Sequence, residues 1–253
     1  MRPLIECLDV NAMDWQPLGP AGLYSKLLSR DPETGARTAL QRMVPADGYE
    51  APTVAHYHHT YEEIIGVHGL FTFDSKRWIR PYSYVFHPPR TVHGFKSQVP
   101  EESWFLSRVG RDLDVNYEEN PTADDIYPLD GVPYVRAAQA FADPASEPGF
   151  RPMQWGTSDQ PVECCMLSVH PETGEGTAFI RVPAGWRSEI VHDGDYLEWF
   201  VMEGDLRADD HEMKRFFYSF RPKGTAPKVM SSQGGAVLYV NFGAPGLIPA
   251  RNA

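Results

Sequence analysis

Few cysteines and no long apolar run limit what this chain of 253 residues can be. Its three cysteines are Cys7, Cys164 and Cys165, and adjacent cysteines rarely pair with each other. An odd total also argues against a disulfide framework. No run of about 18 apolar residues occurs, so no transmembrane helix is expected. The N-terminus lacks the apolar core of a signal peptide, and we expect a cytoplasmic protein.

Positive charge is also scarce, because 23 Lys and Arg face 34 Asp and Glu, for a net charge of −11. This balance argues against nucleic acids and anionic membranes as partners and leaves a small-molecule substrate as the expected one. Apolar residues make up 42% of the chain, enough for an ordinary globular core. The 21 glycines and 23 prolines fall at short intervals, which is typical of all-β proteins with many turns.

The chain repeats itself. Residues 27–49 and 166–186 share the pattern Pro-Glu-Thr-Gly followed by Thr and, four residues on, Arg. The offset between matching landmarks falls from 139 at Pro32 and Pro171 to 133 at Gly110 and Gly243. A steady drift over matched positions indicates an internal duplication of one all-β unit.

Each half shows the turn and strand signals of such a unit. Residues 31–35, Asp-Pro-Glu-Thr-Gly, predict a hairpin loop, since Pro fixes φ early in the turn and Gly accepts a positive φ at its end. Strands are predicted over residues 38–44, 62–68, 82–87 and 103–109.

We divide the chain into an N-terminal barrel over residues 1–117, a linker over 118–150 and a C-terminal barrel over 151–253. The linker is rich in Pro, Asp and Ala, and residues 135–141 within it are interpreted as a short helix. The acidic stretch 112–119 is interpreted as a solvated linker.

The chemistry is concentrated between His56 and His93. His56 and His58 stand two apart, so on a strand both rings point to the same face. Glu62 follows after a short bend, and His93 comes after two further strands. Burying three imidazoles and a carboxylate without a metal would be costly. The set suits one divalent transition metal (Fe, Mn, Ni, Cu or Zn) better than Mg or Ca.

Glu63 is the rival carboxylate to Glu62. The distance to Gly69 and a parallel in the second half, where Glu198 follows His192 at the same spacing, both favour Glu62.

The second half departs from this pattern. The positions that match His58 and His93 hold Gly194 and Pro227. A metal held by one His and one Glu would be weakly bound, so we expect one metal per chain and a metal-free C-terminal barrel.

These residues resemble the cupin superfamily (RmlC-like), whose first motif is Gly-x5-His-x-His-x3–4-Glu-x6-Gly. The run His56-x-His58-x3-Glu62-x6-Gly69 fits from the first His onward, and Gly48 lies two residues too far upstream to be the leading glycine.

The second motif of the superfamily, Gly-x5-Pro-x-Gly-x2-His-x3-Asn, is only partly matched. Pro88 and His93 are in place, and Tyr82 and Arg90 stand where the motif has glycines. With the duplication, the chain is similar to a bicupin with one intact metal motif, of the kind found in ChrR-like and cupin dioxygenase proteins.

The resemblance implies two tandem jelly-roll β-barrels, all-β with a few short helices, and a metal inside the first barrel. It also implies an Fe(II) dioxygenase that cleaves a C–C bond of a small diketone, enol or phenol-like substrate, with His56, His58, Glu62 and His93 as ligands. Zn, Mn, Ni and Cu remain possible metals, and a homodimer is the family-based expectation.

Three alternatives stay open. A metal-dependent isomerase, lyase or cyclase would work without O2 and would need a general base, for which His87 and Tyr84 are the candidates. A non-catalytic ligand-binding or sensor cupin is the second, although nothing in the chain looks like an output domain. A purely structural bicupin is the third, and the retention of ligands in one half alone argues against it.

Overall fold

The computed structural model describes residues 1–129, 136, 139–141 and 149–247, and it is built from β-strands. The only helical element in these ranges is a 3₁₀ turn, η1, at Pro45–Asp47, so no described helix is long and apolar enough to cross a membrane. The predicted all-β class with jelly-roll barrels is confirmed. Two compact units are present: Asp14–Asp143 with Met1, and Arg2–Met13 with Pro144–Ala253.

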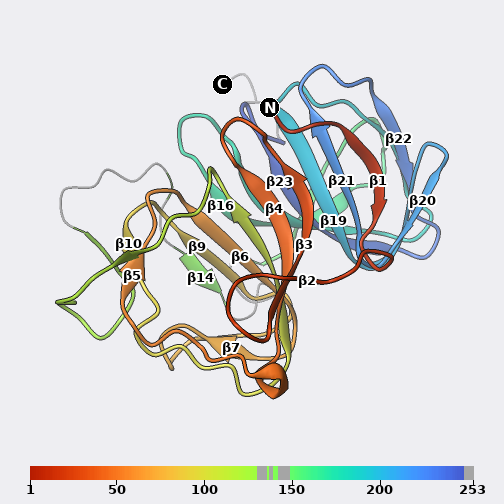
Figure 1. Cartoon of the computed structure of the whole chain (residues 1–253). Coiled ribbons are helices and arrows are strands. Elements are labelled where there is room, and N and C mark those ends of the chain that lie inside the picture. Colours follow the sequence, from red (N-terminus) through yellow and green to blue (C-terminus); the bar gives the residue numbers. More distant parts are fainter. Residues whose placement is uncertain (130–135, 137–138, 142–148, 248–253) are drawn as a thin grey trace. The chain divides into compact units, whose positions relative to one another are not determined.

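The first unit is organised around a seven-stranded antiparallel sheet in the order β14-β9-β6-β11-β4-β3-β2 (Figure 1). Its strands are β2 (Gln16–Pro17), β3 (Leu23–Arg30), β4 (Arg37–Met43), β6 (Glu62–His68), β9 (Tyr84–His87), β11 (Ser103–Val109) and β14 (Gln139–Phe141). Three short pairs complete it: β5 (His56–Tyr57) with β12 (Asn116–Tyr117), β7 (Phe71–Thr72) with β8 (Trp78–Ile79), and β10 (Thr91–Val92) with β13 (Tyr127–Pro128).

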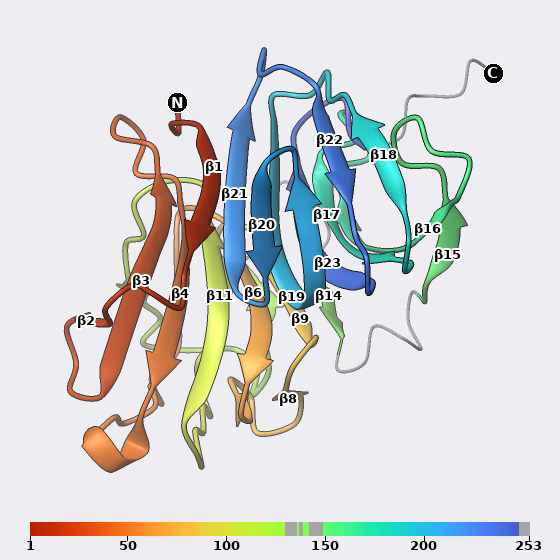
Figure 2. The same ribbon diagram turned by 90° about the vertical axis from the view of Figure 1, so that its right-hand side faces the viewer.

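The second unit repeats this arrangement in the order β1-β21-β19-β23-β17-β16-β15, with three further strands attached (Figure 2). Its strands are β1 (Ile5–Asp9), β15 (Arg151–Met153), β16 (Val162–Val169), β17 (Gly176–Val182), β18 (Arg187–Ile190), β19 (Tyr196–Ala208), β20 (His211–Lys214), β21 (Phe217–Pro222), β22 (Lys228–Ser231) and β23 (Ala236–Phe242). The same strand order in both units is the structural form of the duplication.

The predicted strands agree closely with β4, β6, β9 and β11. Strand β9 begins two residues later than predicted because Tyr82 has a left-handed backbone, with φ of 71°, which ends extended pairing there. The hairpin loop between β3 and β4 ends at Gly35, whose φ is 75°. The predicted short helix is wrong for residues 139–141, which form β14 and pair with β9. Residues 135, 137 and 138 of that prediction lie outside the described part.

Each sheet takes an edge strand from the segment that precedes the other half in sequence. β1 lies antiparallel to β21 in the second unit, and β14 lies antiparallel to β9 in the first (Figures 1 and 2). Residues 2–13 therefore belong to the second unit, and the described linker residues 118–129, 136 and 139–141 belong to the first. These boundaries replace the expected divisions at 117 and 150, because edge pairing, and not sequence order, decides where the segments fold.

A buried carboxylate fixes each edge strand. In the first unit Glu63, fully buried, accepts from the Tyr84 hydroxyl at 2.7 Å and from Arg108 and Arg136 at 3.3 and 3.2 Å. Arg136 lies three residues before the start of the edge strand β14.

The second unit has an equivalent group. Glu198 accepts from the Tyr218 hydroxyl at 2.7 Å and from Arg2 at 3.4 Å. Arg2 precedes the edge strand β1 as Arg136 precedes β14.

The buried pair between Arg2 and Glu198 should therefore stabilise the second unit. Arg2→Leu leaves a buried carboxylate without its cation, and we expect it to lower the free energy of unfolding by about 3 kcal/mol. Urea denaturation followed by tryptophan fluorescence measures this. Arg181→Gln, which removes an exposed pair with Glu163, is the control and should cost no more than about 0.5 kcal/mol. Equal effects of the two variants would contradict the role of Arg2.

Candidate metal site

The four predicted ligands come together in the first unit. His56 lies in β5, His58 follows it directly, Glu62 opens β6, and His93 follows β10. His56 and His93 face each other in an antiparallel bridge, in which each backbone N–H donates to the other's carbonyl, at 3.0 and 2.9 Å. This bridge brings together residues from two ends of the motif.

The side chains converge on a common point. Ligand atoms of His56, His58 and His93 lie within 4.8 Å of one another, and the same holds for Glu62, His87 and His93. The Glu62 Oε2 atom is 3.5 Å from His93 Nε2 and 3.9 Å from His58 Nε2. His93 belongs to both groups and therefore lies at the centre of the site.

Hydrogen bonds at Nδ1 fix the orientation of all three predicted histidine ligands. His56 Nδ1 donates to the carbonyl of Val54 at 3.0 Å, and His93 Nδ1 donates to that of Thr91 at 2.9 Å. His58 Nδ1 donates to the carbonyl of Asp114. A ring that donates through Nδ1 keeps the Nε2 lone pair for a metal, which is the usual arrangement of histidine ligands.

His87 is a fifth candidate. It lies at the end of β9, where it pairs with Glu62 across the strands, and its Nδ1 is 3.8 Å from Glu62 Oε2. Its side chain is 2% exposed, and neither ring nitrogen has a hydrogen-bond partner among the described residues. Two buried nitrogens without partners beside a carboxylate and an imidazole indicate a ligand or a proton-handling group.

The environment sets the charges of these groups. Burial, helped by the nearby His93, lowers the pKa of His56 to about 4 and that of His87 to about 4. Burial alone would raise the pKa of Glu62, but its imidazole neighbours, His87 and His93, hold it well below its usual range. Near neutral pH His56 and His87 are therefore neutral and Glu62 is ionised, the forms in which these side chains bind metals.

These residues fit a divalent transition metal. The donor set is three or four imidazole nitrogens and one carboxylate oxygen, nearly all buried, with His56 alone partly exposed. Mixed N/O donors of this kind suit Fe, Mn, Ni, Cu and Zn. The geometry does not choose among these metals.

Other sequence candidates lie away from this point. The Tyr84 hydroxyl donates to Glu63 on the opposite face of the sheet from Glu62 and His87, so Tyr84 does not join the cluster as a general base. Glu63, the rival carboxylate, binds Tyr84 and two arginines. His59 is exposed and its ring lies 2.5 Å from the Asp114 carboxylate.

The second unit has lost this donor set more completely than the sequence indicated. In the register of β19, Glu198 pairs with Asn241 and with Phe220, as Glu63 pairs with Arg108 and Phe86. Glu198 therefore corresponds to Glu63, and the parallel that favoured Glu62 was a one-residue misalignment.

The position that matches Glu62 is Leu197, and the position that matches His87 is Arg221. Arg221 is buried and donates to Glu6 on β1 at 3.1 Å. His192 remains and its Nε2 is 3.0 Å from the Thr225 hydroxyl. A cavity of about 830 Å³ lined by Trp155, His192, Leu197 and Phe242, among others, adjoins these positions. A leucine and a guanidinium there exclude a metal centre like that of the first unit.

Solved structures with a similar fold include dioxygenases and an oxalate decarboxylase. A candidate dioxygenase from Nostoc punctiforme is 14% identical, with a TM-score of 0.71 over 97% of this chain and 84% of that one. Salicylate 1,2-dioxygenase from Pseudaminobacter salicylatoxidans is 13% identical, with a TM-score of 0.60 over 87% and 76%. A Bacillus subtilis oxalate decarboxylase mutant is 12% identical, with a TM-score of 0.60 over 97% and 78%.

At these identities the likeness concerns the fold alone. A comparison with curated proteins gives no significant match. The model of the ChrR cupin-like domain matches the sequence twice, over residues 6–109 and 149–245, which together make up most of the chain. Apart from residues 6–13, which pair in the second unit, each match falls within one barrel, and the chain therefore belongs to the ChrR cupin-like family as a tandem pair of cupin domains.

Proposed function

We propose that this protein is a metal-dependent cupin enzyme, an Fe(II) dioxygenase that cleaves a C–C bond of a small diketone, enol or phenol-like substrate. The observation that carries the proposal is the convergence of three Nδ1-anchored imidazoles and Glu62 in one barrel. Relatives of the same fold include a salicylate 1,2-dioxygenase, which supports an oxidative reaction without fixing the substrate.

The side chains have separate tasks. His56, His58 and His93 would hold the metal through Nε2, and the carboxylate of Glu62 would offset part of its charge. Bound iron would supply a Lewis acid and a template for substrate and O2. The anchored rings keep the donor geometry rigid, and the burial of Glu62, His58 and His93 keeps water away from it.

We infer that a substrate approaches from the side of His56, the one partly exposed residue of the donor set. Val54, which holds this ring through its carbonyl, is 54% exposed, and Tyr117, which pairs with His56 across β12 and β5, is 68% exposed. An entrance bordered by an apolar and an aromatic side chain favours a small substrate with an apolar or ring-containing body.

His87 supports a second candidate. Its neutral, unpartnered ring beside Glu62 could accept a proton from a substrate, as an isomerase, lyase or cyclase without O2 would require. The two candidates differ in whether O2 is consumed.

His93 should be indispensable for metal binding, since it belongs to both ligand groups. We expect His93→Ala protein to purify without metal, whereas His192→Ala, the control in the second unit, keeps one metal per chain. Inductively coupled plasma mass spectrometry measures the metal content of each variant, and circular dichroism checks that both variants fold. Equal loss in both variants would contradict the assignment of the metal to the first unit alone.

Oxygen uptake tests the reaction type. Wild-type protein loaded anaerobically with Fe(II) should consume O2 with at least one member of a panel of 1,3-diketones and dihydroxy-aromatics. His93→Ala should consume none, because its metal is lost. Turnover of a panel member without O2 consumption, abolished in His87→Phe, would instead establish the second candidate.

The metal-free protein should lose stability in mild acid. His56 and His87 take up protons at about pH 4 in the fold and near 6.5 when unfolded. Between these values the unfolded chain binds more protons, so stability falls as the pH falls through this window. We expect the melting temperature of chelator-treated protein to drop between pH 6.5 and 4, and His87→Phe to reduce that drop. The control His211→Gln changes an exposed residue of β20 and should leave the drop unchanged. An unaltered drop in His87→Phe would contradict the role of His87 in the acid sensitivity.

A further inference from the structure

The acidic segment after β11 is solvated, as expected, but it is paired with the barrel and is not a free linker. Residues 112–129, here called the strap, carry β12, which pairs with β5, and β13, which pairs with β10. β5 contains His56, and β10 leads directly into His93. Between the two short pairs, the Glu118 N–H donates to the carbonyl of Ala55 at 2.9 Å. The strap therefore borders the metal site along both strands that carry histidine ligands.

At its first end the strap orients one ligand. Asp114 offers its carbonyl to His58 Nδ1, and its carboxylate accepts from the backbone N–H of His59 at 2.9 Å and from Asn116 at 2.6 Å. The acceptors for His56 and His93 lie two residues from their own rings, whereas Asp114 is 56 residues from His58. Of the three anchored rings, only His58 depends on a remote segment for its orientation.

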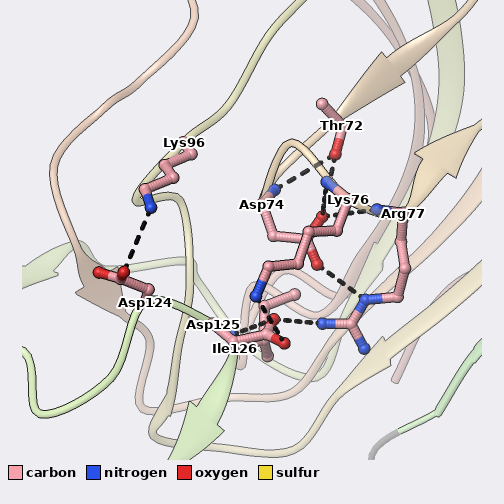
Figure 3. Close-up of polar contacts among 8 residues, drawn as sticks. All are labelled: Thr72, Asp74, Lys76, Arg77, Lys96, Asp124, Asp125 and Ile126. Atoms are coloured by element: carbon pink, nitrogen blue, oxygen red, sulfur yellow. Dashed lines mark hydrogen bonds and ion pairs between the residues drawn. The ribbon is translucent and has the colours of Figure 1, made fainter.

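At its other end the strap is held by ion pairs (Figure 3). Asp125 accepts from Arg77 at 2.6 Å and lies 3.6 Å from Lys76, and Asp124 lies 3.5 Å from Lys96. These cations come from the loop between β7 and β8 and from the turn after His93. We call the pair of Arg77 and Asp125 the latch.

The latch is held in place from within the unit. Asp74, 1% exposed, accepts from Arg77 Nε at 2.7 Å and from the backbone N–H groups of Lys76 and Arg77 at 2.9 and 2.8 Å. Figure 3 shows the guanidinium between the carboxylates of Asp74 and Asp125. Because Asp74 already fixes Arg77, closing the latch costs little side-chain entropy, unlike an ordinary surface pair.

We propose that the strap is a positioning element of the metal site and that the latch sets how tightly the site holds its metal. Resting on the metal site proposed above, the inference assigns a role to residues outside the donor set. Opening the latch leaves residues 124–126 held only by the longer pairs with Lys76 and Lys96, loosens β13 and β12 in turn, and leaves the acceptor of His58 Nδ1 less firmly fixed. Loss of such support for a ligand weakens metal binding.

Co²⁺ is a suitable probe, because its visible absorption reports both occupancy and ligand geometry. We expect Asp125→Asn and Arg77→Gln each to weaken Co²⁺ binding about 3- to 10-fold and to speed its release to a chelator by a similar factor. The Co²⁺ spectrum should broaden or shift in both. Arg77→Lys, which keeps a cation, should restore part of the affinity.

The matched control is Glu163→Gln, which removes an ion pair with Arg181 in the second unit. That pair is 2.7 Å long with side chains 49% and 46% exposed, close to 43% and 48% for Asp125 and Arg77. Its Co²⁺ affinity and spectrum should equal those of the wild type. Added NaCl should speed metal release from the wild type and have less effect on Asp125→Asn, since the latch is screened by salt.

The outcomes separate the two proposals. A wild-type affinity, release rate and spectrum in Asp125→Asn and Arg77→Gln would overturn the strap and leave the metal site intact. Equal changes in Glu163→Gln would overturn it as well, because the effect would then be general. Failure of the wild-type protein to bind Co²⁺, Fe²⁺ or Zn²⁺ would overturn the metal site and, with it, the strap's role.

Discussion

The metal site depends on the reciprocal backbone hydrogen bonds between His56 and His93. Residues so far apart in sequence can present ligands to one atom only if their main chains are in register, and this bridge sets that register. Once it forms, the carbonyls of Val54 and Thr91 anchor the two rings within their own turns. Glu62 needs no separate hydrogen bond to position it, because strand β6 holds its carboxylate 3.5 Å from His93. The site is thus a consequence of strand pairing more than of side-chain packing.

The duplication separates what the barrel needs from what the chemistry needs. Both units keep the strand order, the exchanged edge strand and a buried glutamate held by a tyrosine and an arginine. Only the first unit keeps the ligands. Glu63 and Glu198 serve the scaffold, whereas the neighbouring positions, Glu62 and Leu197, face the other side of the sheet and differ between the two units. Adjacent residues on one strand therefore have unrelated tasks.

Much of this could be predicted from the sequence. Period-two patterning and turn residues predicted β4, β6 and β11 to within one residue, and the His-x-His spacing identified side chains that the structure brings together. His87 was recognised only as a candidate, since its cross-strand pairing with Glu62 is a long-range property. The edge strands were missed because nothing local in Ile5–Asp9 or Gln139–Phe141 says which sheet they join. The pairing of the strap with the barrel was missed for a related reason. An acidic run is interpreted as solvated when the cationic residues that pair with it lie far away in the sequence.

The second unit also explains why a barrel of this type can exist without a metal. Where the first unit gathers Glu62 and His87, the second has Leu197 and Arg221, so an apolar group and a fixed cation stand in place of an anion and a neutral base. Arg221 is satisfied by Glu6, which lies on the exchanged strand β1. The edge strand β1 thus supplies, through Glu6, the negative charge that balances the buried Arg221. Because the second barrel folds around the buried Arg221 without this donor set, a metal held by the first barrel would be an addition to a scaffold that does not need it in order to fold.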